Sequence, residues 1–282
     1  MICLFPRRWV FTKVATLQHT ATNLVRWISA IGRAPRARTP RWRASAWAAI
    51  VLGIAVIIAT MFLLDAATSA WARHLPHRLV DFAEEITVFG LSGWFLYSLA
   101  FILIFLAALT GPSLPPFAQE IMALFAARAG FLFTAIALPS LFGTIIKRII
   151  GRARPFVAPL DDPFVYRPFA WQPEYASMPS GHATTAAAAA IAFGAIWPRW
   201  RAVMWLYALI IMLTRVVLNV HHPSDVLAGA LVGIVGALLV RCWFAARELT
   251  FTPDLRAKPG PSWEQLDAVV HAIAQTPIKS KS

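Results

Sequence analysis

Six long apolar segments recur along the chain, with polar segments between them. The first, Ala44–Leu64, carries no charged residue and is long enough to cross the core of a bilayer. Five more follow at Phe89–Leu109, Ala129–Ile150, Ala183–Trp197, Ala202–Leu218 and Val226–Cys242. This pattern predicts an all-α, polytopic membrane protein whose six transmembrane helices form a bundle. The proline-containing segment Gly111–Arg128 is predicted to turn the chain back between the second and third spans.

The basic residues predict how the chain is oriented. The first 43 residues contain nine Lys or Arg and no acidic residue, which favours a cytoplasmic N-terminus. Six spans then return the C-terminus to the cytoplasm. This topology also places five further basic residues on the cytoplasmic side, where basic residues are favoured: Arg199, Arg201, Arg247, Arg256 and Lys258. The sequence therefore predicts a cytoplasmic arm at 1–43, a membrane domain at 44–246 and a cytoplasmic tail at 247–282.

Both terminal regions contain candidate amphipathic helices. In the arm, apolar residues recur at steps of three and four: Val14, Leu17, Ala21, Leu24, Ile28 and Ile31. We expect this helix to lie on the lipid surface, with the arginine-rich segment Gly32–Arg43 attracted to anionic membrane lipids. A short amphipathic helix is also predicted at Ser262–Ala274 in the tail.

Composition agrees with a membrane protein and argues against nucleic-acid binding, a disulfide framework and a cysteine metal site. Hydrophobic residues make up 59% of the 282 positions and charged residues 14%, and the formal net charge is +13. Such a charge is compatible with nucleic acid or with an anionic membrane, and the apolar segments favour the membrane. Cys3 and Cys242 are the only cysteines and lie at opposite ends of the sequence, so neither a disulfide framework nor a cysteine metal site is predicted.

A first cluster of polar residues follows the third span. Lys147 and Arg154 are seven residues apart and would share one helix face if the third span continued to Pro155. Two fixed cations on one face suit a phosphate-like anion. The alternative is that they extend to lipid headgroups, as we expect Arg148 and Arg152 to do.

A second cluster, Pro179–His182, precedes the fourth span. Ser180 is placed as the N-cap, and the first backbone N–H groups of a helix form a ready anion site that Gly181 leaves accessible. His182 could protonate a leaving oxygen; the alternative is a structural cap with a solvated histidine. Because the fourth span has only about 15 residues, or roughly 22 Å, we expect the site to be recessed into the membrane.

The third cluster lies between the fifth and sixth spans and combines Arg215, His221, His222 and Asp225. Ionisable groups at the edge of hydrocarbon are costly and are usually retained for function. Asp225 is spaced to hold one nitrogen of His221, as in catalytic triads, but spacing alone leaves both histidines as candidate nucleophiles. A six-span topology puts all three clusters at the outer face, where they can meet.

Taken together, three motifs resemble the signature of the type-2 phosphatidic acid phosphatase and vanadium haloperoxidase superfamily, in its membrane lipid phosphatase branch. These motifs are Lys147-x6-Arg154-Pro155, Pro179-Ser180-Gly181-His182 and Arg215-x5-His221-x3-Asp225. The resemblance covers about Phe89 to Cys242. One residue departs from the pattern, since Thr214 stands where serine is common; it keeps the hydroxyl, so we expect tuning rather than loss of activity.

The resemblance implies a mechanism and a role for each residue. His221 would attack phosphorus to give a phosphohistidine, Asp225 would orient it, and His182 would act as general acid. The phosphoryl oxygens would be held by Lys147, Arg154, Ser180, the Gly181 amide and Arg215. No cofactor and no metal is expected; the adjacent Asp161 and Asp162 fit loop solvation better than a cation site.

The expected function is that of a phosphatase at the periplasmic face of a bacterial inner membrane. Candidate substrates implied by the family are undecaprenyl diphosphate, phosphatidic acid, phosphatidylglycerol phosphate and the lipid A 1-phosphate. Alternatives are phosphotransfer to another lipid, oxidation of halide with bound vanadate, and a non-catalytic lipid-binding or transport protein. The sequence does not choose among the four lipids.

Two further features have structural interpretations. The segment Phe156–Met178 contains aromatic residues that we expect to anchor a loop at the membrane interface, with a lid over the site as the alternative. In the sixth span, Gly229, Gly233 and Gly236 predict a close-packing helix face, and a contact with a second copy in a homo-oligomer is one use for it.

Overall fold

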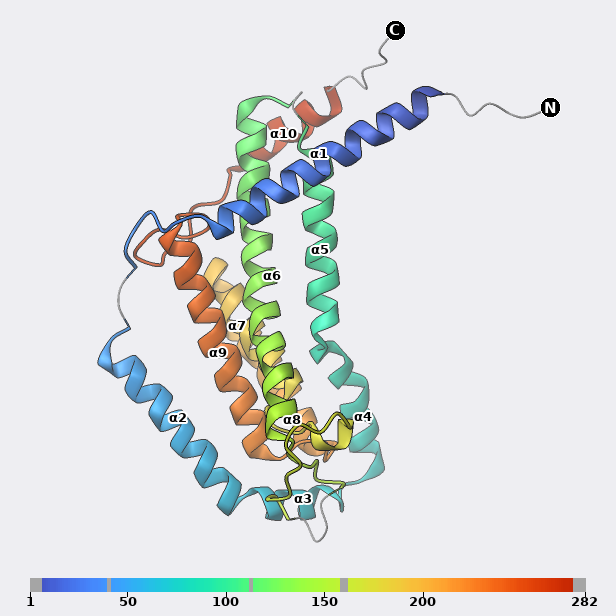
Figure 1. The fold of residues 1–282 in the computed structure, drawn as a ribbon, viewed down its shortest axis with the longest axis vertical. Helices are drawn as coiled ribbons and strands as arrows, with labels where there is room; N and C mark the ends of the chain where they lie inside the picture. Colours follow the sequence, from blue (N-terminus) through green and yellow to red (C-terminus); the bar gives the residue numbers. More distant parts are fainter. Residues whose placement is uncertain (1–6, 40–41, 112–113, 158–161, 276–282) are drawn as a thin grey trace, which may run out of the picture. The chain divides into compact units, whose positions relative to one another are not determined.

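The computed structural model describes residues 7–39, 42–111, 114–157 and 162–275, and its regular structure is helical (Figure 1). The α-helices are α1 Arg7–Gly32, α2 Ala44–Leu63, α3 Asp65–Ala72, α4 His77–Thr87, α5 Ser92–Leu109, α6 Pro116–Ile150, α7 Gly181–Ile196, α8 Arg201–Val217, α9 Pro223–Ala246 and α10 Trp263–Gln275. Short 3-10 turns occur at Val88–Gly90, Pro173–Tyr175 and Pro198–Trp200. Within these described ranges, β-structure is limited to two isolated bridges, Arg152 with Tyr166 and Phe251 with Ala257.

The helices are those of a multi-pass membrane protein. In the described part of the chain, five helical stretches are long and apolar enough to cross a membrane: Ala44–Leu63, His77–Leu109, Pro116–Ile150, Pro198–Val217 and Pro223–Ala246. The fourth predicted span corresponds to α7, which is apolar but only 16 residues long. The all-helical membrane fold is therefore confirmed, whereas the count of six spans stays a prediction.

Helix α6 begins well before the predicted third span, Ala129–Ile150, and ends at the predicted residue, Ile150. Pro115 and Pro116 do not turn the chain back; proline fits the first turn of a helix, where its missing N–H has no partner to lose, and α6 runs from Pro116 for 35 residues. At the other end the helix stops at Ile150, because Gly151 has a φ of +62°. A Cβ at Gly151 would lie 1.7 Å from Arg167 O. The helix does not continue to Pro155, which was the condition for a shared helix face, so Lys147 and Arg154 do not lie on one helix face.

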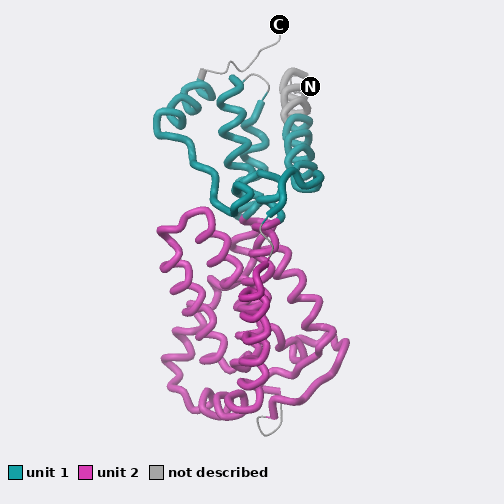
Figure 2. Tube along the Cα trace, turned by 90° about the vertical axis from the view of Figure 1, so that its left-hand side faces the viewer, with its two compact units in different colours: residues 1–39, 98–131, 243–282 teal, residues 40–97, 132–242 magenta. Residues whose placement is uncertain are grey.

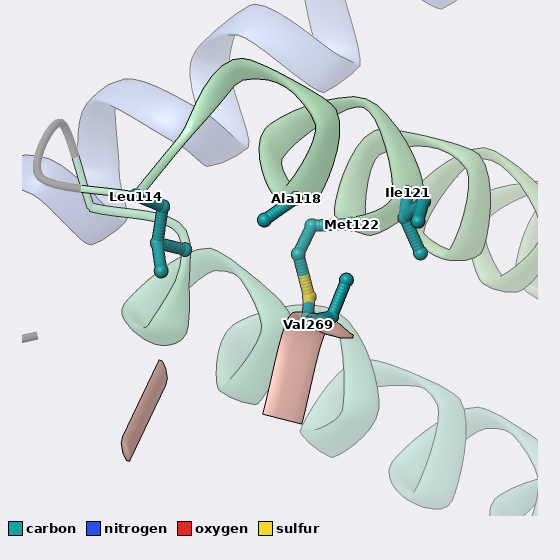
Figure 3. Packing of buried hydrophobic residues seen from close by; sticks show 5 residues of the cluster. All are labelled: Leu114, Ala118, Ile121, Met122 and Val269. Carbon is teal, nitrogen blue, oxygen red and sulfur yellow. The ribbon is translucent and has the colours of Figure 1, made fainter. Parts of the chain in front are cut away.

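The chain divides into two compact units, which Figure 2 colours separately. Unit 1 comprises residues 1–39, 98–131 and 243–282, and unit 2 comprises residues 40–97 and 132–242. Unit 1 has a small apolar core between the start of α6 and α10, formed by Leu114, Ala118, Ile121, Met122 and Val269 (Figure 3). The amphipathic helix predicted in the tail is α10, and it buries Val269 in this core.

Helix α1 confirms the helix predicted in the N-terminal arm and belongs to unit 1. The side-chain amide of Asn23 donates to Ala107 O and Thr110 O, which are free carbonyls at the end of α5. Trp243 Nε1 donates to Ile31 O near the end of α1. Leu17, Val25 and Ile28 remain exposed. Contact of this face with anionic lipids stays a prediction, as do the domain limits at residues 43 and 246.

Unit 2 is built around α7. Its alanine-rich sequence lets neighbouring helices approach closely, and most of its residues are buried. On one side, Ala186 and Ala190 pack with Ala208 and Ile211 of α8. The N-terminus of α7 is thereby fixed in the interior of the unit.

The glycines of α9 explain how α7 is enclosed on another side. A Cβ at Gly229 would lie 2.4 Å from Ser180 O, and a Cβ at Gly233 would lie 2.4 Å from Thr184 O. At Gly236 it would lie 2.5 Å from Pro139 Cγ of α6. The predicted close-packing face is confirmed, but it packs against α7 and α6 of the same chain. These glycines are therefore not available to a second copy, and a homo-oligomer through other surfaces stays a prediction.

Candidate functional site

The chain leaving α6 carries the first cluster into the interior of unit 2. After the left-handed Gly151, residues 152–154 run in an extended conformation: Ala153 N donates to Val165 O, and Arg154 N donates to Glu174 O. Ser177 N donates to Arg152 O from the other end of the same loop. These backbone bonds fix the direction of each side chain, so Arg152 points inward.

Arg152 is fully buried, and its guanidinium is the most heavily bonded group of the site. Nε donates to Pro163 O at 2.9 Å, and Nη1 donates to Ser224 Oγ at 2.7 Å and to Asp225 Oδ1 at 2.6 Å. Nη2 donates to Asp65 Oδ2 at 2.8 Å. Burial alone would lower the pKa of Arg152, but the two carboxylates outweigh it and raise that pKa above its ordinary value.

The expectation that Arg148 and Arg152 extend to lipid headgroups was therefore wrong. Arg152 is enclosed among carboxylates because a buried guanidinium needs paired charge. Arg148 Nη1 donates to Trp171 O at 2.6 Å and holds the loop backbone instead. The Trp171 side chain is 80% exposed, in keeping with the predicted interfacial loop; a lid role stays a prediction.

The N-terminus of α7 presents the second cluster. Ser180 occupies the N-cap position with an extended backbone, as predicted, but its hydroxyl makes no cap hydrogen bond. Ser180 Oγ is buried and has no hydrogen-bond partner within the described ranges. Lys147 Nζ lies beside Gly181, since a Cβ added there would be 3.2 Å from it. An ammonium group, a free hydroxyl and a helix N-terminus thus converge.

His182 follows directly and packs against the turn that precedes α5. A Cβ at Gly90 would lie 2.8 Å from His182 Cδ2, so only glycine leaves room for this ring. His182 is half-buried and interacts electrostatically with Arg215, His221 and Lys147. The second cluster therefore meets the first and the third, as the sequence predicted.

The third cluster spans the end of α8 and the start of α9. Arg215 lies in the last turn of α8, where its Nη1 donates to Thr87 Oγ1 of α4 at 2.6 Å. Thr214 Oγ1 donates to Ile211 O and lies 3.0 Å from the same Thr87 hydroxyl. The hydroxyl that Thr214 shares with serine is thus used to position Thr87, which in turn holds Arg215.

His221 and Asp225 do not touch directly. The distance from His221 Nδ1 to Asp225 Oδ2 is 3.9 Å, which is too long for a hydrogen bond. Ser177 lies between them: its hydroxyl donates to Asp225 Oδ2 at 2.6 Å and lies 3.4 Å from His221 Nδ1. The carboxylate therefore acts on the imidazole largely through Ser177, a residue that the sequence motifs did not single out.

The second histidine of the pair has a different environment. His222 is fully buried, its backbone N–H donates to Asp225 Oδ2 at 2.9 Å, and its Nδ1 lies 3.1 Å from Ser69 Oγ of α3. His221 instead faces Ser177, and the cations that act on it are Arg154 and Arg215. The structure thus gives His221 and His222 different environments, whereas spacing alone left both as candidate nucleophiles.

Electrostatics keep His221 neutral at ordinary pH. Its pKa is lowered to about 4, mainly because the imidazole is buried; Asp225 acts in the opposite direction, and the cations Arg215 and Arg154 add to the lowering. A neutral imidazole retains the lone pair that nucleophilic attack requires.

The polar side chains of the site fall into two groups. We call Lys147, Arg154, Ser180 and Arg215 the open group, because it contains three buried polar atoms that lack a hydrogen-bond partner in the described part of the chain. These atoms are Arg154 Nε, Ser180 Oγ and Arg215 Nε. We call Asp65, Arg152, Ser177, Ser224 and Asp225 the closed group, because its members bond to one another. The open group can still accept an anion.

Two other places were considered as sites. Among the described residues, no cluster of three or more His, Cys, Asp or Glu side chains could hold a metal ion. Asp161 lies outside the described residues, and Asp162 Oδ1 accepts the backbone N–H of Phe164 at 2.9 Å within the loop. A cavity of about 300 Å³ lies at the opposite end of α7 from the open group, lined by Phe193, Trp197, Arg199, Trp200 and Met204. It contains none of the predicted site residues.

All eight predicted site residues come together in unit 2, but sequence reasoning missed their supports. Asp65 and Thr87 lie on α3 and α4, Ser177 precedes the second motif, and Ser224 is one of the three variable positions of the third motif. A usable signal existed for Asp65 alone, as a carboxylate at the end of an apolar span. The others are serine and threonine, whose partners cannot be read from local spacing.

Comparisons with known proteins identify relatives of this chain. The model of the PAP2 superfamily matches residues 128–249. A lipid A 1-phosphatase of Rhizobium johnstonii is 34% identical over 226 residues, covering 76% of this chain and 91% of that protein. A lipid A 1-phosphatase of Rhizobium etli is 33% identical over 217 residues, covering 76% and 90%. A crystal structure of a transmembrane PAP2 type phosphatidylglycerolphosphate phosphatase from Bacillus subtilis aligns with a TM-score of 0.48 at 22% identity, covering 69% of this chain and 93% of that one.

Proposed function

This chain belongs to the PAP2 superfamily and is a multi-pass membrane lipid phosphatase, and we propose that it removes the 1-phosphate of lipid A through a phosphohistidine at His221. The chemistry is proposed from the site, and the choice of lipid rests on the two Rhizobium relatives. We further propose that the site faces the periplasm of a bacterial inner membrane and that both termini are cytoplasmic.

The observation that carries the proposal is the unpartnered hydroxyl of Ser180. Buried polar groups are almost always hydrogen-bonded, so a buried hydroxyl that has no partner within the described part of the chain is well placed to bind a ligand. It lies at the N-terminus of α7 near Lys147 Nζ, where an anion is stabilised by the helix dipole and by fixed positive charge. A phosphoryl group, with several strong acceptor oxygens, fits these donors.

In the first step, the Nε2 lone pair of His221 attacks phosphorus. A nitrogen–phosphorus bond forms as the bond from phosphorus to the sugar oxygen breaks. His182, whose protonated form is stabilised by the negative charge of the bound phosphate, gives its proton to that leaving oxygen. Lys147, Arg154, Ser180, the Gly181 amide and Arg215 stabilise the charge on the phosphoryl oxygens. The positive charge that develops on His221 is stabilised by Asp225, acting through Ser177.

In the second step, water attacks the phosphohistidine. The now neutral His182 accepts a proton from this water, the nitrogen–phosphorus bond breaks, and inorganic phosphate leaves with His221 restored. None of these proton transfers requires a metal ion. We therefore propose that the reaction is independent of metals.

The decisive test is phosphate release by the purified protein with a chelator present. Lipid A bisphosphate would be compared with phosphatidic acid, phosphatidylglycerol phosphate and undecaprenyl diphosphate, and mass spectrometry would locate the phosphate lost. We expect release from lipid A at position 1, and none from the His221→Ala variant. Preference for another of the four lipids would overturn the substrate; full activity of His221→Ala would overturn the mechanism.

A further inference from the structure

We propose that Asp65 and Arg152 are positioning residues of the phosphatase reaction, which hold Asp225 behind His221 and keep its negative charge available to the imidazole. This inference rests on the proposed function. Neither residue belongs to the motifs that name the site residues, and Asp65 lies outside the matched family region, residues 128–249. The proposal therefore assigns a role in the reaction to α3, which lies in the N-terminal part of unit 2.

The first step of the argument is how Asp225 is held. Its Oδ1 accepts from Arg152 Nη1, and its Oδ2 accepts from Ser177 Oγ and from the backbone N–H of His222. With donors on both oxygens, the carboxylate cannot rotate, and Oδ2 stays on the side of His221. Among the residues that the structure describes, Arg152 is the only one whose side chain donates to Oδ1, so it fixes that side of the carboxylate.

The second step is what holds Arg152. Asp65 Oδ2 accepts from Arg152 Nη2 at 2.8 Å, and Asp65 Oδ1 accepts from the backbone N–H of Ser224 at 3.0 Å. The hydroxyl of Ser224 donates to Asp65 as well and accepts from Arg152 Nη1. Asp65 thereby joins the start of α3 to the first turn of α9, which carries Asp225. All four side chains are fully buried, so water does not compete for these bonds.

The third step concerns charge. If Arg152 paired with Asp225 alone, its positive charge would neutralise the carboxylate that faces His221. Two carboxylates around one guanidinium leave one net negative charge, and this charge lies next to the imidazole on which positive charge develops during attack. Asp65 shares the guanidinium, so Asp225 keeps more of its charge for His221. Because neither Asp65 nor Arg152 is part of the open group, their loss should lower turnover and spare substrate binding.

The experiment compares the purified full-length variants Asp65→Asn, Asp65→Glu, Arg152→Gln and the double variant Asp65→Asn/Arg152→Gln with wild type. We expect Asp65→Asn and Arg152→Gln to lower kcat by about 10- to 100-fold, the range found when residues supporting a reacting group are removed, with KM changed by about twofold or less. Asp65→Glu, which keeps the charge, should recover part of the lost kcat. The double variant should be no slower than Arg152→Gln, since Asp65 acts through Arg152.

Ser69→Ala is the matched control. Ser69 is also a buried polar residue of α3, one turn after Asp65, but its hydroxyl meets His222 rather than Asp225. We expect its kcat and KM to stay within about twofold of wild type. A kcat loss in Ser69→Ala as large as that in Asp65→Asn would show a general effect of disturbing α3 and would overturn the proposal.

Folding is the main competing explanation, because removing one partner of a buried ion pair leaves the other charge unpaired. The double variant removes both charges and is the decisive protein if a single variant does not fold. A double variant that folds and has wild-type kcat would overturn the proposal. The proposal would also be overturned if Ser69→Ala folds but none of the charge-removing variants does. Wild type and His221→Ala are assayed in parallel: an inactive wild type refutes the proposed function, whereas an active wild type with an active Asp65→Asn refutes this inference alone.

Discussion

The open and closed groups lie side by side in unit 2, but they satisfy their hydrogen bonds in opposite ways. In the closed group, Arg152 makes four hydrogen bonds and each carboxylate accepts from several donors. In the open group, Ser180 Oγ is buried with no partner in the described part of the chain. Since burying an unpaired polar group costs free energy, the open group is stabilised when an anion binds, whereas the closed group is complete without one.

This difference separates two kinds of residue that look alike in a sequence. Arg152 and Arg154 are two positions apart, yet one is enclosed by carboxylates and the other keeps a buried Nε without a partner within the described ranges. Ser177 and Ser180 are three positions apart and differ in the same way. Substitutions in the open group should therefore impair activity and spare stability, and those in the closed group should affect both.

The largest effect is expected at the nucleophile, which stands between the two groups. His221→Ala should lower kcat by about 10⁴-fold or more, as loss of a covalent nucleophile does elsewhere, because the attacking nitrogen is removed. In the test, each protein is mixed with ³²P-labelled substrate and the reaction is stopped without acid. Wild-type protein should carry the label, and the variant should not. Equal labelling of His221→Ala would place the phosphoryl group on another residue, with His222 the first to examine.

The next largest effect is expected in the open group. Ser180→Ala should lower kcat/KM by about 10²-fold, because one preorganised donor to the phosphoryl oxygens is lost. Its free energy of unfolding should change by about 0.5 kcal/mol or less, since the hydroxyl has no partner to lose in the free protein. Thermal unfolding and steady-state kinetics on the same preparation test both parts. A marked loss of stability would show that Ser180 is bonded in the free protein.

The matching serine of the closed group should respond differently. Ser177→Ala removes the donor to Asp225 Oδ2 and the link to His221, so kcat should fall by roughly tenfold with KM unchanged. The variant should also lose about 1 to 2 kcal/mol of stability, because a buried carboxylate loses a hydrogen bond. If Ser177→Ala and Ser180→Ala showed the same kinetic and stability pattern, the distinction between the groups would be wrong.

The low pKa of His221 predicts the pH dependence. A histidine with the ordinary pKa of about 6.5 would be mostly protonated at pH 5 and unable to attack. With its pKa lowered to about 4 by burial, His221 stays neutral, so kcat/KM should fall by about twofold or less between pH 7 and pH 5. The measurement is a kcat/KM profile corrected for ionisation of the substrate phosphate. A loss of an order of magnitude or more across this range would show an unperturbed nucleophile.

The same shift has a consequence for stability. The histidine protonates near pH 6.5 in the unfolded chain but only near pH 4 in the folded one, so the unfolded state binds more protons in between. His221 therefore destabilises the folded protein as the pH falls from about 6.5 towards 4. Replacing it with alanine should flatten the decline in thermal stability over this window.

The sequence was a good guide to helices and to the motif residues. The apolar run at Ala44–Leu64 became α2, Ala44–Leu63, and the run at Ala183–Trp197 became α7, Gly181–Ile196. The motif residues lie at helix ends that apolar runs define well, so their meeting could be predicted. The start of α6 was missed, because proline acts differently in the first turn of a helix than in the helix interior.

The supports of the site could not be predicted from local patterns. Arg152 and Asp65 are 87 residues apart, and Arg215 and Thr87 are 128 residues apart. Each pair is brought together by how α3 and α4 pack in unit 2, which apolar periodicity does not specify. Arg152 was misread for the same reason: an arginine near a span end fits a lipid headgroup equally well until its partners are known.

The smallest effect is expected at Thr214, the one departure from the family pattern. Thr214→Ser keeps the hydroxyl that donates to Ile211 O and lies 3.0 Å from Thr87 Oγ1, and it removes only a methyl group. Activity should therefore stay within about twofold of wild type, with a stability loss of about 1 kcal/mol for the buried methyl. Thr214→Val, which keeps the shape and removes the hydroxyl, should disturb Thr87 and lower kcat more. Equal activity of the two variants would show that the hydroxyl does not help to position Arg215.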